Sequence, residues 1–238
     1  MKNAIETKNL TKRYGDNTAV DNLSLTVKEG ELFALLGING AGKTTTIRML
    51  SCLSKPTEGT AKVFNADVMN DSDSVKKMVG ISTQDTAVAE KLTVEENLRF
   101  MADIYNIDRS SVEKVIEDFN LSEVRKKRAK HLSGGWQRRL SIAMAIIGEP
   151  KLLFLDEPTL GLDVIARREL WKEIEKLRSK MTIILTTHYM EEAEALADRI
   201  GVMIKGRMVE LGTLEELEQR TGKKGLEEVF VTITEREA

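Results

Sequence analysis

The stretch that decides the fold is Gly37-Ile38-Asn39-Gly40-Ala41-Gly42-Lys43-Thr44-Thr45. It matches the pattern G-x-x-x-x-G-K-[ST], which forms a phosphate-binding loop where it follows a strand and opens a helix. The apolar run at 31–36 has the length of a strand, and residues 44–50 can continue as a helix. Glycines leave backbone N–H groups open to phosphate oxygens, and the helix N-terminus adds partial positive charge. The sequence therefore predicts a nucleotide-binding α/β protein.

Particular residues of this stretch have predicted roles. Lys43 can reach the β- and γ-phosphates of a nucleotide, and the Thr44 hydroxyl can ligate Mg²⁺. A glycine-rich turn before a helix is the plainer alternative, which the flanking strand and helix disfavour. The residues expected to contact the nucleotide are Gly37, Asn39, Gly40, Ala41, Gly42, Lys43, Thr44 and Thr45.

Bulk composition limits the remaining possibilities. The chain has 238 residues, enough for one large domain or a domain with an inserted subdomain. Its net charge of −2 gives no long-range case for binding nucleic acid. The single cysteine, Cys52, excludes an internal disulfide. No apolar run approaches the ~20 residues that span a bilayer, and the N-terminus does not resemble a signal peptide. We expect a cytoplasmic chain whose membrane work needs a separate partner.

The periodicity of apolar residues changes along the chain. Residues 4–28 alternate apolar and polar positions, which predicts an N-terminal antiparallel β subdomain. From Thr93 to about Phe119 the spacing becomes helical. An all-helical stretch inside an α/β chain predicts an inserted helical subdomain at roughly 88–147, within a single domain spanning 1–238. The residues expected on one helical face are Leu98, Met101, Ile104 and Tyr105.

Two further apolar strands end in polar side chains. Residues 152–155 are fully apolar and lead into Asp156 and Glu157, at the edge where open α/β sheets bind ligands. Asp156 can hold the hydration shell of Mg²⁺, and Glu157 can orient or deprotonate an attacking water. The buried strand at 181–187 ends at His188, which can reach a γ-phosphate. A histidine that only packs in the core is the alternative.

Other segments carry weaker signals. Ser133 is a good N-cap candidate, and Gly134 and Gly135 leave amides exposed, so they form a second candidate anion site. Tyr14, at the end of the first strand, can stack on adenine or can cap the sheet, and its position favours neither. The basic run at 125–130 is typical of a solvated helix face.

This set of motifs, in this order, resembles the nucleotide-binding subunit of ATP-binding cassette (ABC) transporters over nearly the whole chain. The family's fold is a P-loop NTPase core, similar to RecA, with a β subdomain and a helical subdomain. The matches are residues 37–45 with Walker A, Phe154-Leu155-Asp156-Glu157 with Walker B, Gln84 with the Q-loop glutamine, Leu132-Ser133-Gly134-Gly135 with the signature, Gly161-Leu162-Asp163 with the D-loop, and His188 with the switch histidine.

The resemblance implies a mechanism that one chain cannot complete. Two cassettes pair head to tail around two ATP molecules, so that the phosphate loop of one faces Ser133, Gly134 and Gly135 of the other. Gln84 would then serve both catalysis and Mg²⁺, and Asp163 would contact nucleotide. Tyr14 falls where the family places an adenine-stacking aromatic. The implied partners are a second copy of the chain and transmembrane permease subunits, with which the chain would sit peripherally on the inner face of the cell membrane.

The subtype resembles the bacterial drug-resistance exporters, through the segments at 188–194 and 225–230. Trp136 and Ile38 depart from the commoner glutamine and proline of the family. The alternatives are an importer or lipoprotein-release complex, a soluble cassette, and a binding subunit without hydrolysis. A soluble chromosome-type cassette would have long coiled coils, and ribosome factors usually carry two cassettes. Hydrolysis is favoured because its residues are intact, namely Lys43, Asp156, Glu157 and His188.

Overall fold

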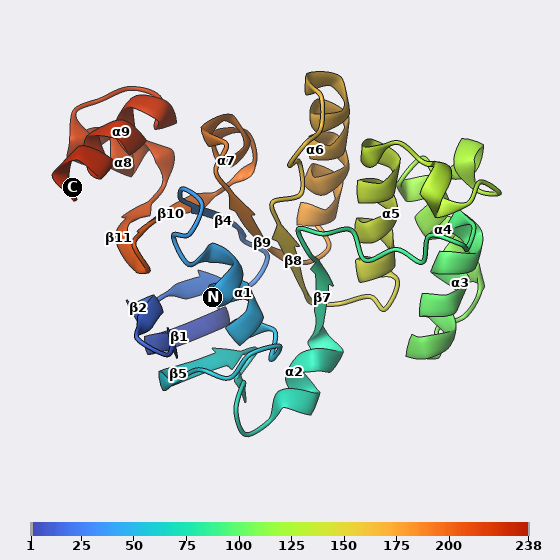
Figure 1. The fold of residues 1–238 in the computed structure, drawn as a ribbon, viewed down its shortest axis with the longest axis horizontal. Coiled ribbons are helices and arrows are strands. Elements are labelled where there is room, and N and C mark those ends of the chain that lie inside the picture. Colours follow the sequence, from blue (N-terminus) through green and yellow to red (C-terminus); the bar gives the residue numbers. More distant parts are fainter. Residues whose placement is uncertain (1, 238) are drawn as a thin grey trace.

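A six-stranded sheet forms the centre of the computed structural model, which describes residues 2–237 (Figure 1). The strand order is β11-β10-β4-β9-β8-β7, and every neighbouring pair is parallel except β10 with β11. Strands β4, β8 and β9 are buried along their whole length, as expected of parallel strands covered on both faces. The strands are β4 Leu32–Leu36, β7 Val79–Ser82, β8 Leu152–Asp156, β9 Thr182–Thr187, β10 Arg199–Ile204 and β11 Arg207–Gly212.

A second, antiparallel sheet confirms the predicted N-terminal β subdomain. Strand β1 pairs with β2, β3 and β5, and β5 pairs with β6. Helix α1, Lys43–Leu50, contacts β2 and β5 of this sheet and β8 of the central sheet, so it lies between the two layers (Figure 1). The strands are β1 Asn3–Tyr14, β2 Asn17–Leu23, β3 Thr26–Lys28, β5 Glu58–Val63 and β6 Ala66–Asp67.

Helices α3 to α5 gather at the β7 end of the central sheet, at the right of Figure 1. Helix α3 begins at a capping box, in which Thr93 and Glu96 satisfy each other's backbone amides. The group shares one core with the sheet, where Leu98, Ile116 and Leu140 join Leu153 and Leu185. These helices, with α2 leading into β7, are α2 Ser72–Met78, α3 Val94–Tyr105, α4 Ser110–Asp118 and α5 Gly134–Ile146, and short 3₁₀ turns occupy 122–124 and 129–131.

The predicted apolar face of α3 is wrong in part. Leu98 is buried, but Ile104 is 59% exposed and Tyr105 is 43% exposed. The buried stripe instead follows Val94, Leu98 and Ala102 at a spacing of four residues. Helix α3 carries more apolar residues than its core-facing stripe needs, and spacing alone does not indicate which of them face solvent.

The remaining helices cover the far face and the β11 edge. Helix α7 packs on β4 and β9 and also contacts α9, and α8 and α9 enclose a third core with Ala34, Ile200 and Phe230. The last helix extends to Arg236. Between residues 2 and 237, no helix is both long and apolar enough to span a bilayer. These helices are α6 Val164–Arg178, α7 Met190–Leu196, α8 Leu214–Thr221 and α9 Leu226–Arg236.

Candidate nucleotide-binding site

The predicted phosphate loop joins β4 to α1, as its strand–loop–helix context requires. Gly42, directly before the helix, has a φ of 102°, and a Cβ there would lie 2.4 Å from the Ala19 carbonyl oxygen. Position 42 is therefore restricted to glycine by both backbone conformation and space. Gly40 also has a positive φ of 82°, but a Cβ there would meet nothing within 4 Å, because the loop is open on that side.

The loop borders a cavity of about 740 Å³, a size typical of sites for small molecules and cofactors. Tyr14 lies at its edge with 47% of its surface exposed, and the Lys12 ammonium lies 4.9 Å from the centre of its ring. Within the described chain, Gly37 is outside the lining. The lining residues are Tyr14, Asn17, Thr18, Ala19, Asn39, Gly40, Ala41, Gly42, Lys43, Thr44, Thr45, Gln84, Glu157 and Lys205.

Lys43 and Glu157 form a buried ion pair at the floor of this cavity. The Lys43 Nζ lies 3.2 Å from the Glu157 Oε1, and the two side chains are 4% and 7% exposed. Lys43 also donates hydrogen bonds to the carbonyl oxygens of Gly37, at 2.7 Å, and Ile38, at 3.1 Å. Buried charges require such partners. The ammonium is therefore fixed against the phosphate loop.

Asp156 brings together two threonines from different elements. Its Oδ1 accepts a hydrogen bond from the Thr44 hydroxyl of α1, at 3.1 Å, and one from the Thr186 hydroxyl of β9, at 2.5 Å. The Thr44 hydroxyl and the Asp156 carboxylate are therefore close enough to serve one hydrated cation. Residues 2–237 contain no cluster of three or more metal-ligating side chains. The Thr44 hydroxyl and the Asp156 carboxylate together suit Mg²⁺, which protein sites hold with one or two carboxylates plus substrate phosphates.

The carboxylate of Glu157 also reaches the predicted switch histidine. Its Oε2 lies 3.0 Å from the His188 Nδ1. The Glu157 backbone has a φ of 48°, which is uncommon outside glycine, and its N–H donates to the Thr186 carbonyl at 3.0 Å. Strained backbone held by its surroundings is concentrated at functional sites. His188 is only half-buried, and this favours the functional interpretation over a core histidine.

The signature and D-loop residues stand apart from this cavity, whose described lining includes none of them. Gly134 opens α5, and a Cβ built at Gly135 would lie 3.4 Å from the Ala166 side chain. Ser133 occupies the predicted N-cap position, but its hydroxyl makes no capping hydrogen bond to the described residues. Asp163 caps α6, accepting from the N–H groups of Ile165 and Ala166 at 2.9 Å each.

Sequence reasoning missed three residues of the site region. Thr186 faces Asp156 because the register of β8 and β9 pairs them, and no local sequence signal specifies that register. Lys205 enters the cavity from the β10–β11 hairpin. Arg138 binds the backbone at Gln84, with its Nη2 2.6 Å from the Gln84 carbonyl oxygen. The only local signal is the pair Arg138-Arg139 shortly after the signature, and it does not indicate which groups Arg138 contacts.

Glu192 of α7 makes the stability of the folded protein depend on pH. It is fully buried, and its Oε1 accepts from the Trp171 indole at 3.0 Å. Burial raises the pKa of Glu192, and this outweighs the neighbouring Thr187, Thr159 and Trp171 groups, which lower it. The folded state therefore binds a proton more tightly than the unfolded chain does, so stability falls as pH rises from the unfolded pKa through the folded one.

Replacing Glu192 by glutamine should remove this pH dependence. The neutral amide keeps the shape of the side chain but cannot ionise. We expect the Tm of the variant to equal or fall below that of the parent near pH 4, and to exceed it increasingly toward pH 8. Thermal denaturation at a series of pH values measures the difference. A constant difference across that range would show that folding does not raise the pKa of Glu192.

The fold and this site define a class, the P-loop ATPases. Residues 20–160 match the family model described as "ABC transporter". The chain belongs to the ABC transporter family, as an ATP-binding ATPase cassette, and this confirms the resemblance drawn from the motifs.

Curated relatives and solved structures agree with that assignment. The daunorubicin/doxorubicin resistance ATP-binding protein DrrA of Streptomyces peucetius is 43% identical over 228 residues, covering 94% of this chain and 69% of DrrA. The probable multidrug ABC transporter ATP-binding protein YbhF of Escherichia coli is 39% identical, covering 91% of this chain but 38% of YbhF.

Two solved structures share this fold over almost their whole length. An ATP-binding subunit of an ABC transporter has a TM-score of 0.87 at 28% identity, covering 97% of this chain and 99% of that subunit. The ATP-binding cassette MJ0796, in a dimeric post-hydrolysis state with ADP and phosphate, has a TM-score of 0.79 at 27% identity, covering 88% of this chain and 98% of that cassette. The predicted fold class is confirmed.

Proposed function

We propose that this chain is the ATP-hydrolysing subunit of a membrane exporter and acts as an ATP-bound, head-to-tail dimer. The observation that carries the hydrolytic part is the placement of Glu157. Its carboxylate is shared between Lys43, at 3.2 Å, and His188, at 3.0 Å, at the border of the cavity. The export direction rests on the relatives, whose names refer to drug resistance and multidrug transport.

ATP occupies the cavity in this account. The adenine stacks on Tyr14, and residues 39–45 hold the phosphates, with Gly37 shaping the loop. Thr44 and Asp156 would hold Mg²⁺, and Gln84, which lines the same cavity, would serve the ion or the attacking water. Bound there, Mg²⁺ would neutralise charge on the phosphates. Glu157 orients and deprotonates the water, and His188 contacts the γ-phosphate.

The dimer explains why one chain has two separate anion-binding segments. The signature and D-loop residues lie outside the chain's own cavity, at the starts of α5 and α6. They are Ser133, Gly134, Gly135 and Asp163. In the proposed dimer, they complete the cavity of the partner. The dimeric state of MJ0796 supports this arrangement.

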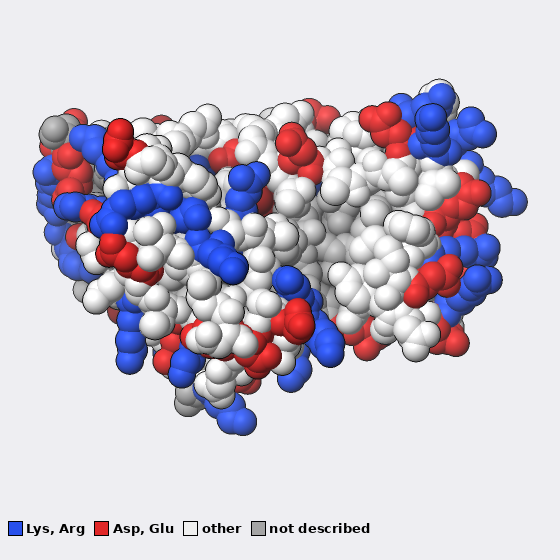
Figure 2. Space-filling view, turned by 60° about the horizontal axis from the view of Figure 1, so that its bottom comes forward, with Lys and Arg blue, Asp and Glu red and all other residues white. Residues whose placement is uncertain are grey.

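The membrane partner docks beside α3. A groove of about 370 Å³ there is lined mainly by apolar residues, including Leu53, Met101 and Tyr105, and Lys76 also borders it. Leu53 is 61% exposed, and Phe100 and Ile104 add to the exposed apolar surface. Figure 2 shows a broad uncharged area and a hollow on the face brought forward, toward the helical side of the molecule. In this account, residues 88–147 move as a subdomain of the single domain 1–238 when ATP binds.

A single charge in this groove should detach the chain from membranes. Leu53→Glu introduces a carboxylate that docking would have to desolvate in a mainly apolar groove, which is unfavourable. We expect the membrane-bound fraction of the chain, in cells that carry its permease, to fall at least tenfold. ATP hydrolysis by the purified variant should stay within about twofold of the parent.

Val231→Glu is the matched control, because Val231 is also exposed and apolar but lies on α9. Equal membrane binding by Leu53→Glu and the parent would contradict the proposed docking surface.

The direction of transport is tested separately in inside-out membrane vesicles. An exporter should accumulate labelled drugs or lipids in the lumen when ATP is added outside, and an importer should not.

A further inference from the structure

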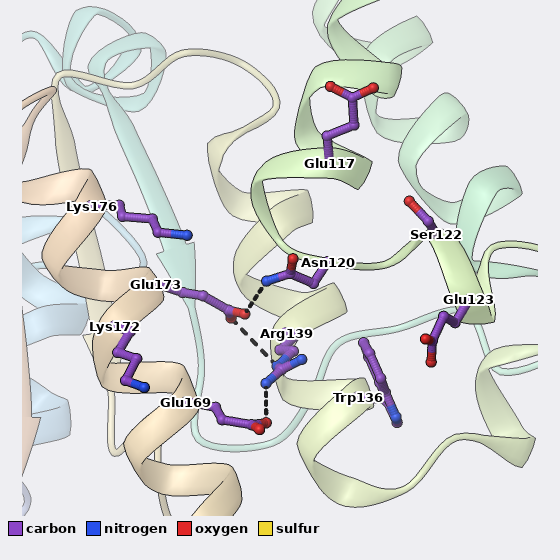
Figure 3. A pocket seen from close by; sticks show the side chains of 10 residues that line it. All are labelled: Glu117, Asn120, Ser122, Glu123, Trp136, Arg139, Glu169, Lys172, Glu173 and Lys176. Carbon is purple, nitrogen blue, oxygen red and sulfur yellow. Dashed lines mark hydrogen bonds and ion pairs between the residues drawn. The ribbon is translucent and has the colours of Figure 1, made fainter.

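Two consecutive arginines of α5, Arg138 and Arg139, contact different parts of the molecule. Figure 3 looks into a cavity of about 670 Å³ between α4, α5 and α6, where Arg139 faces Glu169 and Glu173 of α6. Its Nη2 lies 2.6 Å from the Glu169 Oε2, and its Nε lies 3.4 Å from the Glu173 Oε2. Arg138 binds the loop after β7 instead. The two arginines therefore attach α5 to two different parts of the molecule.

Arg138 holds that loop by its backbone. Its Nη1 donates to the Thr83 carbonyl at 2.6 Å, and its Nη2 donates to the Gln84 carbonyl at 2.6 Å. Arg138 is 4% exposed, and among residues 2–237 it forms no ion pair within 4.0 Å. A buried guanidinium without a carboxylate partner is costly. The planar fork of its donors fits two successive carbonyl groups, a geometry that lysine cannot reproduce.

The contact belongs to a continuous seam along one face of α5. Three residues after Arg138, the Ser141 hydroxyl lies 3.0 Å from the Ser82 hydroxyl at the end of β7. Four residues further on, the Ala145 carbonyl lies so close to Gly80 that a Cβ there would be 2.2 Å from it. Spacings of three and four residues place these contacts on one side of the helix. Strand β7, the loop at 83–84 and α5 are therefore packed as one unit.

This unit joins the two candidate anion sites of the chain. Gln84 lines the nucleotide cavity of its own chain. Ser133 precedes the first residue of α5, five residues before Arg138, which corresponds to about 7.5 Å of helix rise. A shift of the loop at Gln84 is therefore transmitted to the end of α5 that carries Ser133, Gly134 and Gly135.

We propose that Arg138 is a positioning residue that couples nucleotide occupancy of a chain's own cavity to the orientation of its signature segment, residues 133–135. The inference rests on the proposed function, because the signature segment serves the partner's nucleotide. Without Arg138, the cavity still binds ATP through residues 39–45, but the bound state is not communicated to α5.

Hydrogen exchange in the Glu157→Gln protein tests this directly, at a concentration where the chain is monomeric. Mg-ATP should slow the exchange of amides at 83–87 and also at 133–137. In Arg138→Met, added to the same background, ATP should bind within threefold of the parent affinity and still slow exchange at 83–87, but it should no longer protect 133–137. Parallel protection of both segments in Arg138→Met would overturn the proposal.

Two further variants separate coupling from general damage. Arg139→Met removes another buried arginine from the same helix but leaves the loop contact, so linked protection should survive. Arg138→Lys keeps the charge but loses the two-carbonyl geometry, so linked protection should weaken. This variant tests the proposal if Arg138→Met fails to fold. If the parent protects 83–87 alone, the coupling does not exist. A parent that shows linked protection but never dimerises would instead count against the proposed dimer.

Discussion

Glu157→Gln is expected to reduce the rate of ATP hydrolysis by about 10²–10⁴-fold, the range for losing a general base, while ATP still binds. The amide has the shape of the carboxylate but cannot take a proton from water. The Glu157 side chain contacts the phosphate loop through Lys43, which keeps its hydrogen bonds to the Gly37 and Ile38 carbonyl oxygens in the variant. Phosphate release at saturating Mg-ATP measures turnover, and equilibrium titration with a fluorescent ATP analogue measures affinity.

Glu169→Gln is a suitable control, because Glu169 lies on α6 outside the nucleotide cavity, with its side chain 55% exposed. Its turnover should stay close to that of the parent. Normal turnover by Glu157→Gln would show that the role proposed for Glu157 is wrong, whatever the family suggests.

Lys43→Ala should weaken ATP binding by about 10–100-fold. Hydrogen bonds to charged groups contribute about 1.5–3 kcal/mol, which corresponds to this range of affinity. The substitution also leaves the buried Glu157 without its ion-pair partner. We expect the nucleotide-free protein to lose about 3 kcal/mol of stability, the lower end for breaking a buried pair, because His188 still faces Glu157.

Lys205→Ala provides the comparison, since Lys205 also lines the cavity but lies on a hairpin rather than on the phosphate loop. Its effect on ATP affinity should stay below about threefold, as expected for a surface charge in water. ATP titrations and thermal denaturation, with and without nucleotide, measure both quantities. Unchanged ATP affinity in Lys43→Ala would contradict the assignment of the phosphate loop.

The parts of the fold that local patterns specify could be predicted from the sequence. The runs at 32–36 and 152–155 are wholly apolar, and the run at 182–187 is apolar apart from its threonines, so buried parallel strands were the expected form. Their ends meet at one edge of a sheet, and the proximity of Lys43 and Glu157 follows from that geometry.

Features that depend on register or on surplus apolar residues could not be predicted. Thr186 reaches Asp156 through the pairing of β8 and β9, which neither strand specifies alone. Ile104 and Tyr105 are exposed although their spacing resembles that of a core stripe. Ser133 stands at the N-cap of α5 without capping it, which leaves its hydroxyl available for another ligand.

The measurement that tests the central claim most directly is the mass of the Glu157→Gln protein in solution, by light scattering, with and without Mg-ATP. The chain has a mass of 26.7 kDa. We predict that Mg-ATP doubles the measured mass, because each phosphate loop then faces the Ser133 segment of a second copy. A mass that stays at that of the single chain, with ATP shown to be bound, would contradict an ATP-driven dimer.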